Sequence, residues 1–150
     1  MSTNIKLAPF TSAGEVDPTT LTAVNVAPVS RAAAPYPPGN VKLNGIAFAT
    51  SVNGDLVISW NHRNRLGPYI VAQDAGDVAG GPEGTYTIAI RVNNVLIRTI
   101  TGITGNSYTY THAQRVIDDS NAAHTTTITI TPVNSGISGM SRSLSFVMNP

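Results

Sequence analysis

The stretch that decides the fold is Asp55-Leu-Val-Ile-Ser-Trp-Asn-His-Arg-Asn-Arg65, an alternating run that ends on the only tryptophan and continues into a basic cluster. Leu56, Ile58 and Trp60 fall on one face of a period-2 strand. The preceding Asn53-Gly54 is a tight-turn signal, because both residues tolerate positive φ. A lone tryptophan on an early strand of a small cysteine-free chain predicts a two-sheet sandwich with the indole ring between the sheets.

Similar runs recur along the rest of the chain and are separated by turn signals. In 85–92, Tyr86, Ile88, Ile90 and Val92 alternate, and Asn93-Asn94 then predicts a two-residue hairpin. Gly45 is expected to form a bulge, and only 112–119 looks helical. The predicted strands are 41–48, 56–60, 85–92, 95–100, 107–111, 124–132 and 142–148. This pattern predicts an all-β, antiparallel two-sheet sandwich over residues 39–150.

Residues 1–38 differ from the rest, because they hold six of the ten prolines and no sustained periodicity. Proline removes a backbone donor and biases its predecessor toward extended geometry. One interpretation is a disordered leader. The other is an extended Pro-rich N-terminal arm with no fold of its own, in which 17–26 could supply one strand that orders against partner subunits. The second is favoured because several side chains are too apolar for a solvated tail, namely Leu21, Val24, Val26 and Val29.

The composition excludes several classes of function. The formal net charge of the 150 residues is +1, which gives no electrostatic footprint for nucleic acid or for an anionic membrane. No apolar export segment opens the chain, and no run approaches the length of a membrane span. We therefore expect a product that is made in the cytoplasm and is not inserted into a membrane. Only 11% of residues are charged, which suits a surface covered by neighbours, although extracellular β-domains share the trait.

The chain shows no pattern typical of catalysis, of a cofactor or of a metal site. His62, His112 and His124 lie in separate segments without metal-ligand spacing. Asp74 and Asp77 are too few for a calcium loop. Neither a nucleophile elbow nor a phosphate-binding glycine loop occurs. We expect no enzymatic activity, no cofactor and no metal.

The basic cluster after Trp60 allows two interpretations. Arg63 and Arg65 could bind a carboxylate of a partner or an anionic saccharide. Alternatively, and in our view preferably, they cover the sheet edge and pair with Asp74, Asp77 or Glu83. The segment 61–84 exceeds ordinary loop length, and long loops on a rigid sandwich are where contacts are placed. The candidate partner contacts outside the arm are therefore Tyr36, Arg63, Arg65, Tyr69, Ile70 and Val71.

Several of these positions together resemble a fibronectin type III domain over about residues 36–148. The family opens with a Pro-Pro segment, here Pro37-Pro38-Gly39-Asn40, and places a core tryptophan on its second strand, here Trp60. Its core tyrosine on the third strand corresponds to Tyr86, and Val133-Asn134-Ser135-Gly136-Ile137-Ser138 resembles the element after strand F. The tyrosine that the family has early in strand F falls near Thr126 here. The resemblance implies the sandwich fold already predicted from periodicity.

A narrower resemblance concerns three stretches, Pro35-Tyr-Pro-Pro-Gly39, Trp60-Asn-His-Arg-Asn-Arg65 and Ser107-Tyr-Thr-Tyr-Thr111. They are similar to the C-terminal part of tail-tip and baseplate hub proteins of tailed bacteriophages, as is the leader 21–29. Hub proteins are several times longer, so the chain is either a separate small gene product or a detached hub end.

This resemblance implies a structural virion protein of the tail, made in the host cytoplasm and present in multiple copies around the tail axis. Its partners would be other tail or baseplate proteins. The alternative function is a receptor- or saccharide-binding module, directed at a host surface saccharide, or a capsid decoration protein.

Overall fold

The computed structural model describes residues 3–12, 14–26, 33–65, 72, 74–77, 81–118 and 123–149, and of Thr3, Thr11 and Val26 it describes the backbone only. The chain divides into two compact units, Met1–Ala32 and Ala33–Pro150.

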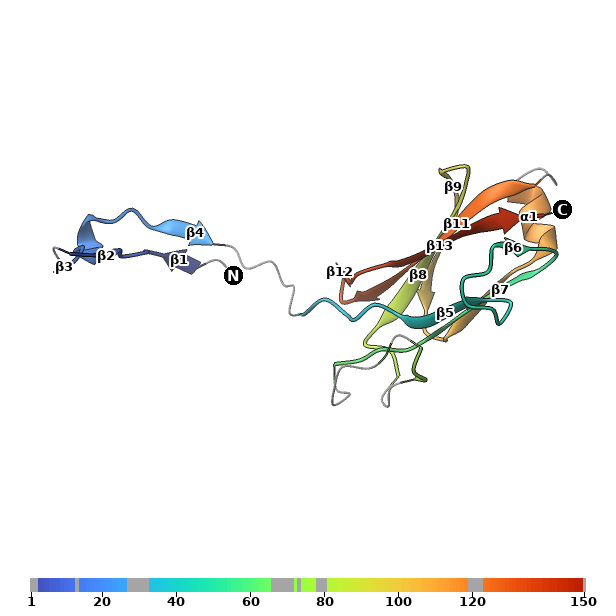
Figure 1. Ribbon diagram of the computed structural model, residues 1–150, viewed down its shortest axis with the longest axis horizontal. Coiled ribbons are helices and arrows are strands. Elements are labelled where there is room, and N and C mark those ends of the chain that lie inside the picture. The colour runs from blue at the N-terminus through green and yellow to red at the C-terminus, as the bar shows by residue number, and fades with distance from the viewer. Residues whose placement is uncertain are drawn as a thin grey trace. The chain divides into compact units, whose positions relative to one another are not determined.

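The second unit is a sandwich of two β-sheets (Figure 1). One sheet has the strand order β10-β7-β5, and the other has the order β6-β13-β11-β8-β9 with β12 paired to β11. All pairs are antiparallel except the short parallel pair of β6 and β13. The strands are β5 (Gly39–Leu43), β6 (Ser51–Val52), β7 (Leu56–Asn61), β8 (Thr85–Val92), β9 (Val95–Ile103), β10 (Ser107–Tyr110), β11 (His124–Asn134), β12 (Ile137–Ser138) and β13 (Arg142–Met148). The predicted all-β sandwich is confirmed, with a fibronectin type III-like distribution of strands between its sheets.

The core lies between the two sheets and follows the period-2 faces of the strands. Trp60 is 1% exposed, and its ring meets the Tyr86 ring edge-on with centroids 5.2 Å apart. The alternation of β8 is complete, since every second side chain from Tyr86 to Val92 is buried. The other core residues are Leu43, Val52, Leu56, Ile58, Ile88, Ile90, Tyr110, Ile128, Ile130, Phe146 and Met148.

The first predicted strand of the sandwich is shorter than expected. Residues 41–48 do not form one strand, because β5 ends at Leu43 and the chain reverses through Asn44 and Gly45, with φ of 48° and 79°. The Ile46 N–H donates to the Leu43 carbonyl at 2.9 Å and closes this turn. Gly45 therefore occupies a tight turn and not a bulge. Both structures need positive φ at glycine, so the residue type alone does not separate them.

The remaining local predictions hold closely. Asn93 and Asn94 have φ of 48° and 69°, which joins β8 to β9 as a two-residue hairpin. The expected helix is α1 (His112–Asp118). Strands β6 and β12 have two residues each and carry no periodic signal, which is why sequence analysis missed them.

The first unit contains paired strands where an arm without a fold was expected. β1 (Thr3–Ile5) pairs antiparallel with β4 (Val24–Val26), and β2 (Phe10–Thr11) pairs with β3 (Gly14–Glu15). A short 3-10 helix, η1 (Pro18–Thr20), follows β3 in the chain and precedes β4. Asp17 caps this helix, since its carboxylate accepts the Thr19 N–H at 2.8 Å. This hydrogen bond lowers the pKa of Asp17. The strand expected within 17–26 is the three-residue β4.

The proline-rich segment 33–38 groups with the sandwich, although it was assigned to the arm by composition. Pro35 and Pro38 are buried. Gly139 lies so close to the Pro35 carbonyl that a Cβ at residue 139 would collide with it. The compact unit accordingly starts at Ala33, several residues before the first strand.

Candidate functional site

Arg63 holds the long loop after β7 from inside. Its guanidinium donates to four carbonyl oxygens, those of His62 (2.9 Å), Gly76 (2.8 Å), Ala75 (2.9 Å) and Ala72 (3.2 Å). The residue is only 8% exposed. The hydrogen bonds to the backbone carbonyls offset the cost of burying this cation. Arg63 thus holds Ala72, Ala75 and Gly76 in place and presents little surface to a partner.

Arg65 joins the loop to the proline-rich segment at the surface. Its backbone N–H donates to Glu83 Oε1 at 2.5 Å, and its side chain reaches Glu83 Oε2 through Nε at 3.1 Å and Nη2 at 3.0 Å. Nη2 also donates to the Ala34 carbonyl at 2.6 Å. The guanidinium lies 5.9 Å from the centroid of the half-exposed Tyr36 ring. The hydrogen bond to Glu83 raises the pKa of Arg65.

The two arginines connect the proline-rich segment with the Trp60–Arg65 stretch. Gly39 pairs with Asn61 across β5 and β7. A Cβ at residue 39 would overlap the Arg63 guanidinium, so a larger residue there would displace the arginine from its hydrogen bonds. Because Arg65 contacts Ala34 and Tyr36 in addition, the two stretches form one connected cluster. We name Ala34, Tyr36, Gly39, Arg63, Arg65 and Glu83 the arginine cluster.

His62 lies beside the arginine cluster and stacks on Tyr86. The rings are 5.7 Å apart with an interplanar angle of 16°, and His62 Nδ1 is 3.2 Å from the Tyr86 hydroxyl. The His62 backbone N–H donates to Asp77 Oδ1 at 2.6 Å. Burial and, next, the nearby Asp77 carboxylate raise the pKa of Tyr86 to about 12. The histidine is used in packing and in fixing the loop.

A second polar cluster attaches α1 to the strands. Asp118 accepts from Arg98 at 2.5 and 2.7 Å and from the Tyr110 hydroxyl at 2.9 Å. The hydrogen bonds from Arg98 lower the pKa of Asp118. This pair could not be predicted from the sequence, because Arg98 and Asp118 lie in different elements and form no motif.

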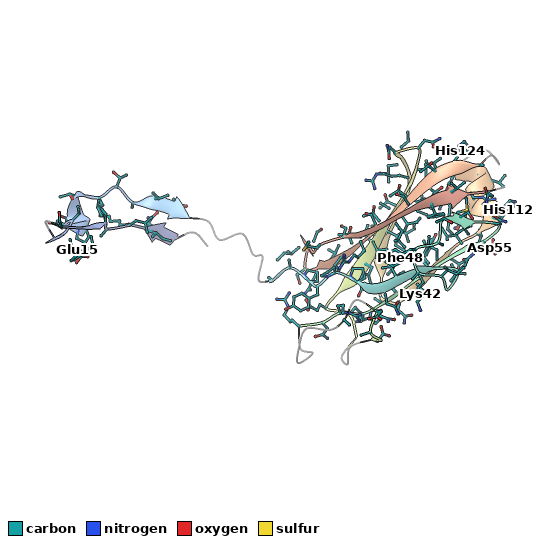
Figure 2. The ribbon with its side chains drawn as sticks, viewed as in Figure 1. Glu15, Lys42, Phe48, Asp55, His112 and His124 are labelled. Atoms are coloured by element: carbon teal, nitrogen blue, oxygen red, sulfur yellow. The ribbon has the colours of Figure 1, made fainter. Side chains whose placement is uncertain are left out.

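The start of α1 is tied to two other segments. Arg115 is buried and donates to the Asn149 carbonyl at 2.7 Å and to His112 Nδ1 at 2.8 Å. The His112 N–H donates to Asp55 Oδ1 at 2.6 Å, and the two residues lie side by side in Figure 2. These contacts fix the short helix against the end of the sandwich.

Three of the predicted arm contacts lie in the described part of the first unit. Val24 is largely exposed on β4, Leu21 is partly exposed, and Val26 is the last residue of β4. Val29 lies outside the described residues, as do the loop candidates Tyr69, Ile70 and Val71. The structure adds exposed apolar residues that were not singled out, among them Phe10, Phe48 and Ile117.

The described part of the chain contains no group of three residues suited to hold a metal ion. The helices in this part of the chain, the three-residue η1 and the seven-residue α1, fall far short of a membrane span.

Comparison with known proteins identifies no family for this chain. No protein-family model matches the chain, and no curated protein matches it. A solved structure that it resembles is the rat CD45 extracellular region, domains d3-d4, at a TM-score of 0.47 and 10% identity. The alignment covers 98% of this chain and 63% of that one, so this chain spans less than two thirds of its length. The fold assignment itself comes from the strand order and register described above.

Proposed function

We propose that the protein is a structural virion protein of a tailed bacteriophage, an interaction module of the tail tip or baseplate that packs against neighbouring virion proteins. The observation that carries the interaction role is the N-terminal unit, which leaves Leu7 and Phe10 more than four-fifths exposed. An isolated two-stranded hairpin is marginal in water. Apolar side chains on such a unit are therefore best explained by a partner surface that covers them.

The assignment to a phage tail is drawn from the resemblance of three stretches to hub proteins. The structure supports their grouping physically, because two of them meet in the arginine cluster. The low charge of the chain agrees with a protein enclosed by neighbours. The rigid sandwich then acts as a spacer, and residues 1–32 act as the attaching part.

A truncation experiment tests this proposal in the particle. Phages carrying the full chain or residues 33–150 are compared for the amount of the protein in purified tails. We expect the truncated chain to remain folded, because the core and the arginine cluster lie within Ala33–Pro150, and to be lost from tails. Normal incorporation of the truncated chain, or absence of the full chain from purified particles, would contradict the proposal.

The alternative is a saccharide-binding module, for which the half-exposed Tyr36 ring beside Arg65 is the favouring feature. Aromatic rings near hydrogen-bonding groups are typical of ligand sites. Binding of the full chain to a glycan array, lost on Tyr36→Ala, would support the alternative. Absence of binding would leave the structural role as the better interpretation.

A further inference from the structure

An apolar pocket opens between the edges of the two sheets. Its volume is about 330 Å³, and it lies between β5, the loop after it, and the first half of β13. The apolar lining comes from Val41, Ala47, Phe48 and Leu144, while Asp74 and Arg142 bring one charge of each sign. The space is large enough for one or two side chains of a partner.

Phe48 at this pocket has two unusual properties. Its φ is 57°, in the left-handed region that β-carbon sterics make unfavourable for a bulky residue. Its side chain is 82% exposed, so no burial within the described residues compensates for the strain. Such an outlier, on a loop marked in Figure 2, points to a functional contact.

The adjoining strand β13 has a free hydrogen-bonding edge. The Val147 N–H points away from β11 and donates to the Thr50 carbonyl at 2.9 Å. The Asn149 N–H likewise donates to the Val52 carbonyl. Backbone groups of alternate residues in a strand point the same way. The backbone N–H and C=O groups of Ser143 and Ser145 therefore also point away from β11. β6 pairs only with Val147 and Met148, and no strand among the described residues pairs with Ser143 or Ser145 on this side.

The chain carries a segment suited to this edge. β4 is an uncharged strand, Val24-Asn25-Val26, and within the described residues it pairs on one side only, with β1. It can therefore pair along β13 without adding an unpaired charge to the pocket, whose lining already contains Asp74 and Arg142. The unit around β4 leaves apolar side chains exposed, at Ile5, Leu7, Phe10 and Val24.

We propose that the pocket and the Ser143–Ser145 edge, together called the β13 groove, bind β4 of a second copy of this chain by strand addition. Main-chain hydrogen bonds to the free edge supply affinity, and an apolar side chain enters the pocket. This inference rests on the proposed role of the N-terminal unit in assembly. It names the partner surface that the unit reaches.

The available area agrees with such an exchange. In the proposed exchange, each contact covers Phe48 and exposed apolar side chains of the N-terminal unit, and one aromatic ring buries roughly 150 Å² or more. With the neighbouring aliphatic side chains, a reciprocal pair of exchanges covers on the order of 1,000 Å², where specific interfaces begin.

Sedimentation of the full chain over a concentration series tests the association. We expect reversible self-association that Phe48→Asn weakens at least tenfold. Asparagine accepts left-handed φ, so this variant keeps its thermal stability. Ile117→Asn is the matched control, since Ile117 is also 82% exposed but lies on α1, outside the pocket lining. A chain that stays monomeric, or equal weakening by both variants, would overturn the inference.

Disulfide cross-linking identifies the contacting strands. Because the sequence has no cysteine, only the introduced cysteines can form a disulfide. A Val24→Cys preparation is mixed with a Ser143→Cys preparation under oxidising conditions. We expect a disulfide between the two, and none when Val95→Cys on β9 replaces Ser143→Cys. Equal yields at both positions would overturn the assignment of β4 to the groove. If the chain is monomeric yet residues 1–32 are still needed in tails, the groove inference fails and the proposed function stands.

Discussion

Gly39 and Arg63 form one contact, and a double-mutant cycle measures its strength. Gly39→Ala places a methyl group where the guanidinium lies, and Arg63 cannot retreat without losing its four carbonyl contacts. We expect this overpacking to lower the free energy of unfolding by about 1–3 kcal/mol. Arg63→Ala removes the buried donor, but Ala72 and Gly76 are exposed and their carbonyls can turn to water. We expect a loss of about 3 kcal/mol for that variant.

In the double variant the methyl group occupies space that the guanidinium has left. Its cost should largely disappear, giving a coupling free energy of about 1–3 kcal/mol. Equilibrium urea unfolding followed by Trp60 fluorescence measures all four proteins. Gly76→Ala is the control, since a Cβ there meets no atom within 4 Å, and it should be nearly neutral. Additivity of the two losses within about 0.5 kcal/mol would refute the proposed contact.

Three further predictions concern the core and the titrating groups. Trp60→Ala should cost about 3–5 kcal/mol through lost burial and a cavity, and a fluorescence maximum near that of free tryptophan in the folded protein would contradict the burial. Asp118→Asn should destabilise by about 1–3 kcal/mol at neutral pH. Because Arg98 lowers the pKa of Asp118 in the folded protein, this stabilisation is present above the ordinary carboxyl pKa and is lost as pH falls through the folded pKa. Urea unfolding of wild type and variant from neutral to acidic pH measures the loss. A difference in unfolding free energy between the two proteins that does not change with pH would contradict the prediction. Tyr86 should ionise at about pH 12, with stability lost as pH rises from about 10; absorbance titration against Tyr86→Phe should show the late step missing, and an identical curve would refute it.

The strands of the sandwich were predictable because burial on one face leaves a period-2 pattern. The bounds of β8 and β13 agree with the predicted ranges, and the inward faces containing Trp60 and Tyr86 follow from alternation. The alternation of apolar and polar residues is strong because both sheets pack against one core. Strands of two or three residues, such as β1 and β4, leave no such pattern.

The arginine cluster was only partly predictable. Pairing of an arginine with a carboxylate could be foreseen, and Arg65 does contact Glu83. The role of Arg63 could not, because its acceptors are backbone carbonyls, and any residue type supplies those. The β13 groove was likewise hidden, since it joins residues about 100 positions apart in the sequence, such as Val41 and Leu144.

Under the proposed function, this chain is an integral part of a phage tail and attaches through its first residues. A cryo-electron microscopy reconstruction of the native particle tests this most directly. We expect repeated copies of the two-sheet sandwich at the tail tip or baseplate, with residues 3–26 ordered against a neighbouring subunit. Density for the sandwich on the capsid surface, or at the tail with residues 3–26 contacting no other chain, would contradict it.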